Sequence, residues 1–264
     1  MSEDFRVSVS KTKTFKQCKK QYNFNYNLKM PKKDRDYHFT GKFCHMVLEE
    51  FHQEYIKGCF LPYNMVMGDC FKKAQIAYKS HMTSEMIKEC WEIIDQYLKV
   101  VSAQKNNGSP ANVIAVEKRF ELTVDKNIIL NGAIDRIQLD DDNVLHVSDY
   151  KTTKNKKYLK DDWFQLLTYA FVLMTDDPSL EVVRASYILL RHNIEYITTQ
   201  FHRPKVMEIK NQYIDFVSQM KSEKAFEANP SALCLYCDFL DLCDEGREKA
   251  GQIKPNMIYG EVNW

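Results

Sequence analysis

The chain has 264 residues, 44% of them hydrophobic, and a formal net charge of +1, so it can bury a sizeable core as one domain over residues 1–264 and is not disordered throughout. No stretch approaches the roughly 20 continuous apolar residues of a membrane span, and the first residues lack the apolar core of a secretory signal. We therefore expect an intracellular protein, cytoplasmic or associated with the nucleoid, that does not bind a membrane.

Residues 1–112 are predicted to be mostly helical. Residues 1–35 hold ten lysines and arginines against three acidic residues. Aromatic residues lie among these lysines, so this segment could bind a nucleic-acid strand or could equally be a solvated surface. The stretch 41–58 has apolar residues at helical spacing and a glycine at each end, which predicts one helix, and a second helical region extends from about residue 64 to 104.

Residues 113–201 are predicted to form a sheet. The stretches 113–124, 128–139 and 144–152 are rich in β-branched residues and are separated by turn-forming sequences, which predicts three consecutive strands. A helix is expected at 161–174, then strands at 182–190 and 194–201, and residues 202–264 hold a further helix (204–226) and a cysteine-rich segment. This order of elements predicts an α/β or α+β fold with a mixed sheet.

The predicted hairpin 132–151 carries five aspartates and one lysine. If its turn is centred on Asp142, residues whose numbers add to 284 face each other, and Asp135 then lies opposite Asp149 with Cβ atoms roughly 4.5–5.5 Å apart. Lys151 shares their face, which is otherwise apolar. Two carboxylates there are costly unless a proton or a cation lies between them, and Mg²⁺ or Mn²⁺ would suit such oxygen ligands. The alternative is a salt bridge between Lys151 and one aspartate at a sheet edge.

Four short motifs follow one another within about residues 41–169. They are Gly41-x-x-x-His45, Gly132-x-x-Asp135, Asp149-Tyr150-Lys151-Thr152 and Gln165-x-x-x-Tyr169. In the order of these four motifs, the chain resembles the RecB-like branch of the PD-(D/E)XK nucleases. The resemblance implies a restriction-endonuclease-like core, with a mixed central sheet flanked by helices, a helical N-terminal region and a C-terminal cysteine cluster.

The same resemblance assigns roles to residues of these motifs. It implies that Asp135, Asp149, His45 and the carbonyl of Tyr150 bind the divalent metal ion. Lys151 would orient or activate the attacking water, while Gln165 and Tyr169 would position the nucleic-acid backbone. Some members keep a glutamate near the site on the preceding strand, where this chain has Glu117.

Near the C-terminus, Cys234, Cys237 and Cys243 have the close spacing of ligands to one metal centre, and Cys18 is the candidate fourth ligand. By resemblance to the iron–sulfur members of the RecB-like branch, which include the CRISPR-associated RecB-like exonucleases and the AddB-type nuclease domains, they would hold a [4Fe–4S] cluster. Structural Zn²⁺ is the alternative, because thiolate spacing alone does not choose the metal. The remaining four cysteines are expected to be small buried hydrophobes.

Together these features predict a metal-dependent DNA nuclease, most consistent with an exonuclease on single-stranded DNA or DNA ends. Its role would lie in DNA processing, recombination or repair, or CRISPR-type adaptation. The chain has no helicase motif, so a helicase or an integration or recombination complex would be its partner. The alternative is a non-catalytic nucleic-acid-binding or assembly protein on the same scaffold, and RNA stays open as a substrate.

Overall fold

The computed structural model describes residues 4–33, 35–104, 110–156, 159 and 162–253. The chain divides into two compact units, which we call the terminal unit (residues 1–34, 121–132 and 208–264) and the core unit (residues 35–120 and 133–207). The single domain predicted over residues 1–264 stays a prediction. Among the described helices, none combines the length and the apolar character that crossing a bilayer requires.

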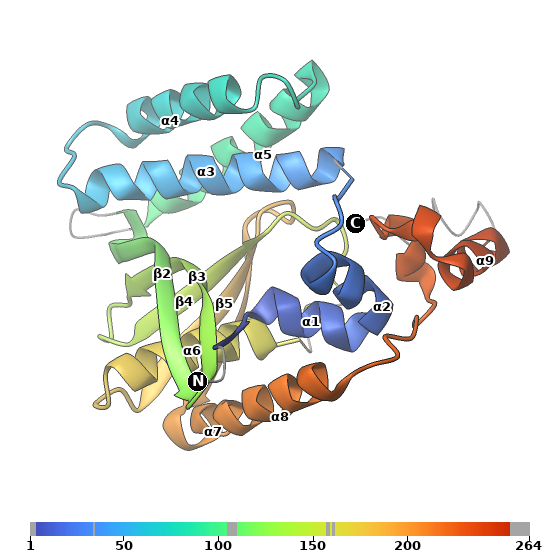
Figure 1. Cartoon of the computed structure of the whole chain (residues 1–264). Coiled ribbons are helices and arrows are strands. Elements are labelled where there is room, and N and C mark those ends of the chain that lie inside the picture. Colours follow the sequence, from blue (N-terminus) through green and yellow to red (C-terminus); the bar gives the residue numbers. More distant parts are fainter. Residues whose placement is uncertain (1–3, 34, 105–109, 157–158, 160–161, 254–264) are drawn as a thin grey trace. The chain divides into compact units, whose positions relative to one another are not determined.

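The core unit begins with three helices that pack against one another (Figure 1). They are α3 (Asp36–Ile56), α4 (Tyr63–Ala77) and α5 (Ser84–Ala103). Helix α5 begins where the Thr83 hydroxyl accepts a hydrogen bond from the Met86 N–H, and its apolar residues recur every three or four positions, as burying one face requires. The buried residues of these helices form one hydrophobic core that also contains Tyr150 and Ile188 from the sheet.

Four strands of the core unit form a mixed sheet. They are β3 (Ile128–Leu139), β4 (Leu145–Lys151), β5 (Val182–Leu189) and β6 (Glu195–His202), and β2 (Val113–Asp125) also pairs with β3. Strands β3 and β4 are antiparallel, β4 and β5 parallel, and β5 and β6 antiparallel. The predicted mixed sheet is therefore confirmed.

Helices cover both faces of this sheet. Helix α6 (Phe164–Asp176) connects β4 to β5 and contacts both strands, whereas Tyr150 and Ile188 pack on the opposite face with residues of α3 and α5 (Figure 1). Strand β5 is almost continuously buried, as expected of a strand covered on both sides. The core unit ends with the short helix α7 (Arg203–Met207), so the helix predicted at 204–226 is observed as α7 followed by α8 (Ile209–Ser222). The predicted fold class, a mixed sheet flanked by helices, is confirmed.

The terminal unit joins both ends of the chain to the start of β3. Strand β1 (Phe5–Val7) pairs in parallel with residues 128–130. Its helices are α1 (Val9–Gln17), α2 (Lys19–Tyr22), which continues into a π-helical turn, α8 (Ile209–Ser222) and α9 (Asp244–Gln252). Phe15 and Tyr22 are 3% and 2% exposed, and Tyr22 stacks on Phe226. These two aromatic rings of the basic N-terminal segment are therefore core residues, and bases cannot stack on them.

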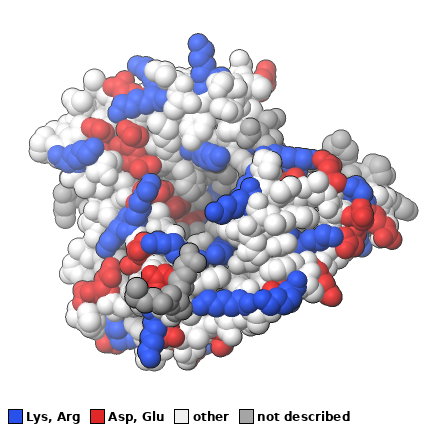
Figure 2. Space-filling model, in the orientation of Figure 1, with Lys and Arg blue, Asp and Glu red and all other residues white. Residues whose placement is uncertain are grey.

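Basic residues of the N-terminal segment pair with acidic residues from the C-terminal part of the chain. Lys19 lies 2.5 Å from Glu223, and Lys20 lies 2.8 Å from Glu245. Lys33 pairs with Asp241 at 2.5 Å. Figure 2 shows lysine and arginine side chains lying among acidic ones on the face in view. Part of the positive charge of residues 1–35 is thus neutralised within the terminal unit itself.

The Lys19–Glu223 pair predicts a pH-dependent contribution to stability. The hydrogen bond from Lys19, helped by the N–H groups of Phe226 and Ala225, lowers the pKa of Glu223 from its usual 4.5 to about 2. Because the folded-state pKa is the lower one, this contribution is complete above pH 4.5 and is lost as the pH falls toward 2. Replacing Glu223 by glutamine, which keeps an acceptor oxygen, should lower the urea midpoint at neutral pH.

The difference between wild type and the Glu223→Gln variant should shrink as the pH falls below 4.5. Urea unfolding followed by circular dichroism at a series of pH values measures it. The Lys19→Met variant is the matched comparison, since it should lose the part of this contribution that Lys19 supplies. A difference that stays constant over the whole pH series would contradict the assignment.

Candidate metal centre

The hairpin of β3 and β4 has the register predicted from the sequence. The paired residues Arg136 and Ser148, Ile137 and Val147, Gln138 and His146, and Leu139 and Leu145 each have numbers that add to 284. The pairing ends at Arg136 and Ser148. Beyond it, the backbone N–H of Tyr150 donates to Oδ2 of Asp135 at 3.0 Å. Asp135 and Asp149 therefore lie just beyond the last paired residues, where a side-chain oxygen takes the place of a backbone acceptor.

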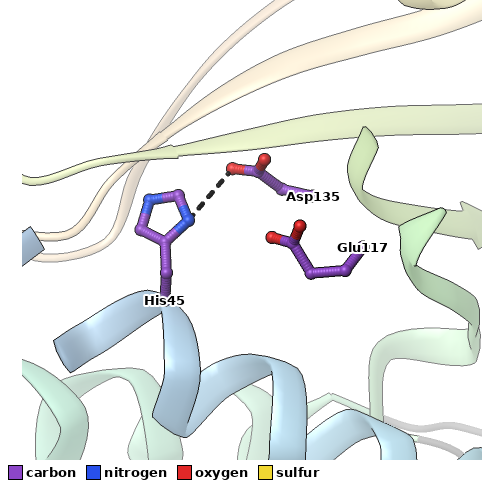
Figure 3. A group of neighbouring side chains, drawn as sticks. All are labelled: His45, Glu117 and Asp135. Atoms are coloured by element: carbon purple, nitrogen blue, oxygen red, sulfur yellow. Dashed lines mark ion pairs between the residues drawn. The ribbon is translucent and has the colours of Figure 1, made fainter. Parts of the chain in front are cut away.

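His45, Glu117 and Asp135 come together beside this end of the pairing. Each offers one ligand atom, and the three atoms all lie within 4.8 Å of one another. Figure 3 shows the imidazole on α3 and the two carboxylates pointing toward one another. Nδ1 of His45 lies 3.4 Å from Oδ2 of Asp135, and Nε2 lies 3.0 Å from the carbonyl oxygen of Tyr150. The ring therefore presents Nδ1 to Asp135 and Nε2 to the carbonyl oxygen of Tyr150.

Local backbone features bring these side chains into place. A Cβ atom on Gly41 would lie 3.2 Å from Oγ1 of Thr152, so glycine lets α3 approach β4 closely, one turn before His45. Glu117 has a φ of 44° inside β2, a conformation that residues with a side chain seldom adopt in a strand. Such strain is retained where the surroundings require it, and here it accompanies a carboxylate that faces His45 and Asp135.

Asp149, Lys151, Gln165 and Tyr169 form a second cluster, on the α6 side of the sheet. Oδ1 of Asp149 accepts hydrogen bonds from Nε2 of Gln165 at 2.5 Å and from the Tyr169 hydroxyl at 3.4 Å. Nζ of Lys151 lies 2.6 Å from Oδ2 of Asp149 and donates to Oε1 of Gln165 at 3.0 Å. The salt bridge considered from the sequence therefore exists, but on a strand inside the sheet, which pairs with β5 at these positions, rather than at a sheet edge.

Burial makes the charged forms of the Asp135 and Glu117 carboxylates costly. Burial raises the pKa of Asp135 well above its usual value, and the neighbouring Asp149 carboxylate raises it further. Burial also raises the pKa of Glu117, again with a contribution from a neighbouring carboxylate, Glu49. A divalent cation would offset both costs, because it supplies positive charge and ligand bonds in place of water. The donor set of one imidazole and several carboxylate oxygens suits Mg²⁺ or Mn²⁺.

The face of the hairpin opposite the carboxylates is buried as well. Arg136 and Ser148 are 1% and 0% exposed, because the helical layer covers this side. The sequence predicts an apolar face around the carboxylates and gives no sign that the opposite face, with Arg136, is covered too. An arginine in a strand where polar and apolar residues alternate does not reveal its own burial, which depends on helices far away in the sequence.

The four predicted cluster cysteines lie in the terminal unit and line one pocket, together with Lys20, Phe24 and residues 228–231. Cys18, Cys234 and Cys243 accept backbone N–H hydrogen bonds at their sulfur atoms, at 3.5, 3.4 and 3.3 Å. All eight cysteines lie within the described residues, and each is a free thiol rather than part of a disulfide. Of the other four, Cys44, Cys70 and Cys90 are buried as expected, and Cys59 is partly exposed.

Comparison with known proteins gives three findings. The model of the PD-(D/E)XK nuclease superfamily matches residues 6–244. One of the subunits of the ATP-dependent helicase/deoxyribonuclease of Clostridium perfringens strain SM101 is 29% identical over 210 residues, which cover 66% of this chain and 18% of that protein, and its counterpart in strain 13 is 28% identical over the same extent. The chain thus spans about a fifth of the curated relatives it matches. A solved structure from Eubacterium rectale, described as a candidate exonuclease, has a TM-score of 0.49 and 14% identity over 97% of this chain and 93% of that one.

Proposed function

Since the chain belongs to the PD-(D/E)XK nuclease superfamily, we propose that it is a divalent-metal-dependent deoxyribonuclease that removes nucleotides from single-stranded DNA or DNA ends. One observation carries this proposal. His45, Asp135, Asp149 and Lys151 are all present in the core unit, where His45 lies beside Asp135, Lys151 lies beside Asp149, and the pairing of the hairpin ends next to both aspartates. A member of the fold that had lost catalysis would be expected to have lost at least one of these side chains.

The residues of the core unit divide the chemistry among them. His45, Asp135, Asp149 and the carbonyl of Tyr150 would hold Mg²⁺ or Mn²⁺, and the geometry favours Glu117 as a further ligand. The bound metal ion would lower the pKa of the attacking water and offset the charge of the scissile phosphate. Lys151 lies beside Asp149, where its ammonium group can orient that water and stabilise the developing negative charge.

Gln165 and Tyr169 would position the DNA backbone, and their contacts support a second role. Both side chains donate to the same oxygen of Asp149, and Gln165 also accepts from Lys151. They therefore fix the orientation of the carboxylate and the ammonium group. Partners that fix a metal ligand in this way affect metal affinity and activity almost as much as the ligands do.

The four cysteines of the terminal unit would hold a [4Fe–4S] cluster with a structural role. Backbone N–H groups that donate to three of the sulfur atoms would stabilise thiolates, as at iron–sulfur centres. Structural Zn²⁺ held by the same four thiolates is the alternative, because the spacing of the cysteines does not choose the metal.

The cellular role would be DNA end processing in recombination, repair or CRISPR-type adaptation. The curated relatives are named as subunits of an ATP-dependent helicase/deoxyribonuclease, and this chain corresponds to 18% of their length. We therefore propose a helicase or a recombination or integration complex as the partner that supplies unwound DNA.

A cleavage assay with end-labelled DNA tests the function. Single- and double-stranded substrates, labelled at the 5′ or the 3′ end, are incubated with Mg²⁺ or Mn²⁺. We expect metal-dependent release of short products from single strands or from duplex ends, and none when EDTA is present or from a covalently closed circular strand. A protein that binds these DNAs but cleaves none of them, and no RNA, would instead be the non-catalytic binding protein considered from the sequence.

A further inference from the structure

A buried arginine lies behind the strand that carries Asp135. Arg136 directly follows Asp135 on β3, so its side chain points to the opposite face of the sheet, where it is 1% exposed. Within the described part of the chain, no carboxylate pairs with it. Its guanidinium donates instead to the hydroxyls of Tyr97 at 3.0 Å and Tyr196 at 3.5 Å, and to the amide oxygen of Gln138. A cation buried without a counter-charge is costly, so its presence calls for an explanation.

Tyr97, on α5, links Arg136 to strand β4. The Tyr97 hydroxyl lies 3.1 Å from the hydroxyl of Tyr150 and 2.6 Å from Nε2 of His52. Burial, together with the charge of Arg136, lowers the pKa of His52 well below its usual value, so this imidazole is neutral. A guanidinium can only donate hydrogen bonds, and Arg136 therefore fixes the Tyr97 oxygen as an acceptor. Hydrogen bonds therefore connect Arg136 through Tyr97 to Tyr150, and in the first of them Arg136 is the donor and Tyr97 the acceptor.

This connection spans the point where the pairing of β3 and β4 ends. The paired residues end at Arg136 and Ser148, and beyond them the backbone of Tyr150 gives its N–H to Asp135 and places its carbonyl 3.0 Å from Nε2 of His45. The backbone of Tyr150 therefore faces the metal centre, while its side-chain hydroxyl is held from behind. Beyond the last backbone hydrogen bonds between two strands, side-chain hydrogen bonds of this kind can set the distance between the strands.

We infer that Arg136 is a positioning residue, which holds the backbone of Tyr150 through Tyr97 at the separation from Asp135 that Mg²⁺ or Mn²⁺ needs. The inference rests on the metal centre of the proposed function and adds to it a determinant on the far side of the sheet. An apolar side chain of similar length would fill the same space but donate no hydrogen bond to Tyr97, Tyr196 or Gln138. Partners that orient metal ligands typically change metal affinity or activity 10–100-fold when they are replaced.

Direct measurement of Mn²⁺ binding tests the inference without reference to activity. Electron paramagnetic resonance of free Mn²⁺ gives the dissociation constant for the full-length wild type and for the Arg136→Met variant. We expect this constant to rise roughly 10-fold or more in the variant. The Tyr97→Phe variant removes only the linking oxygen and should weaken binding in the same direction. The double variant should bind no more weakly than Arg136→Met, because both changes break one connection.

Arg184→Met is the matched control. Arg184 on β5 pairs with Asp140 and Asp142 at the turn of the hairpin, and within the described residues it reaches Arg136 only through Asp140 and Gln138 and does not contact Tyr97. Its replacement should leave the dissociation constant for Mn²⁺ unchanged. Circular dichroism establishes that each variant is folded, and Tyr97→Phe carries the test if Arg136→Met does not fold.

Wild-type affinity in the folded variants would overturn the role of Arg136 and leave the proposed function in place. A wild type that binds no Mn²⁺ would overturn the metal centre itself, so the two failures are distinguishable. Equal weakening in Arg184→Met would also overturn the inference, because the effect would then belong to any arginine lost from the sheet.

Discussion

Replacing Asp149 by asparagine should reduce metal-dependent DNA cleavage on the order of a thousandfold, comparable to the loss of a group that stabilises charge at a reaction centre. The substitution keeps the size of the side chain and an acceptor oxygen for Gln165 and Tyr169. It removes the negative charge that a divalent cation needs and leaves the ammonium group of Lys151 without its counter-ion at 2.6 Å. The initial rate of product release from end-labelled single-stranded DNA measures the effect.

Asp142→Asn is the matched control for this variant. Asp142 lies in the turn of the same hairpin, where its side chain is 54% exposed and pairs with Arg184. We expect its cleavage rate to stay within a few-fold of the wild type, as for surface changes in general. DNA binding, followed by fluorescence anisotropy without Mg²⁺ or Mn²⁺, should be similar in all three proteins. An unchanged cleavage rate in Asp149→Asn would show that the Asp149 carboxylate is not needed for catalysis.

If the proposed iron–sulfur cluster is bound, replacing Cys234 by serine should abolish it and lower the stability of the terminal unit. The wild type, purified without oxygen, should be brown, with broad absorbance near ~400 nm, and the variant should lose this absorbance together with its iron. A structural metal centre contributes its binding energy to folding, so we expect the thermal midpoint to fall by roughly 10 °C. Absorption spectra, metal analysis and calorimetry provide the three measurements.

Cys59→Ser is the control for the cluster. Cys59 is partly exposed and belongs to the core unit, so its replacement should change neither the absorbance nor the iron content. A colourless wild type that contains zinc and no iron would exclude the iron–sulfur cluster and favour the zinc alternative. Full retention of metal and stability by Cys234→Ser would show that this cysteine is not a ligand.

The carboxylates of the hairpin were predictable because they depend on local chemistry. The polar turn at residues 140–143 sets the register, and the alternation of side chains along a strand then assigns Asp135, Asp149 and Lys151 to positions near one another. The end of the pairing at Arg136 was not predictable in this way. It involves a side chain, Asp135, that accepts the N–H of Tyr150 in place of a backbone oxygen.

Features that depend on distant segments were less accessible from the sequence. The burial of Arg136 depends on α5, and the burial of Phe15 and Tyr22 depends on residues near the other end of the chain. The position of Glu117 beside His45 depends on a strained backbone conformation that cannot be predicted from the residue type. In each case the residue type was compatible with a surface position, and only tertiary packing decided otherwise.

The way the chain alternates between its two units has a consequence for the order of events during synthesis. Residues of the core unit have all been made once residue 207 has left the ribosome, whereas the terminal unit also needs residues 208–264. Tyr22 cannot stack on Phe226, nor Lys19 meet Glu223, before those partners exist. The N-terminal helices therefore lack these packing and ion-pair partners until the segment that carries Glu223 and Phe226 has been translated.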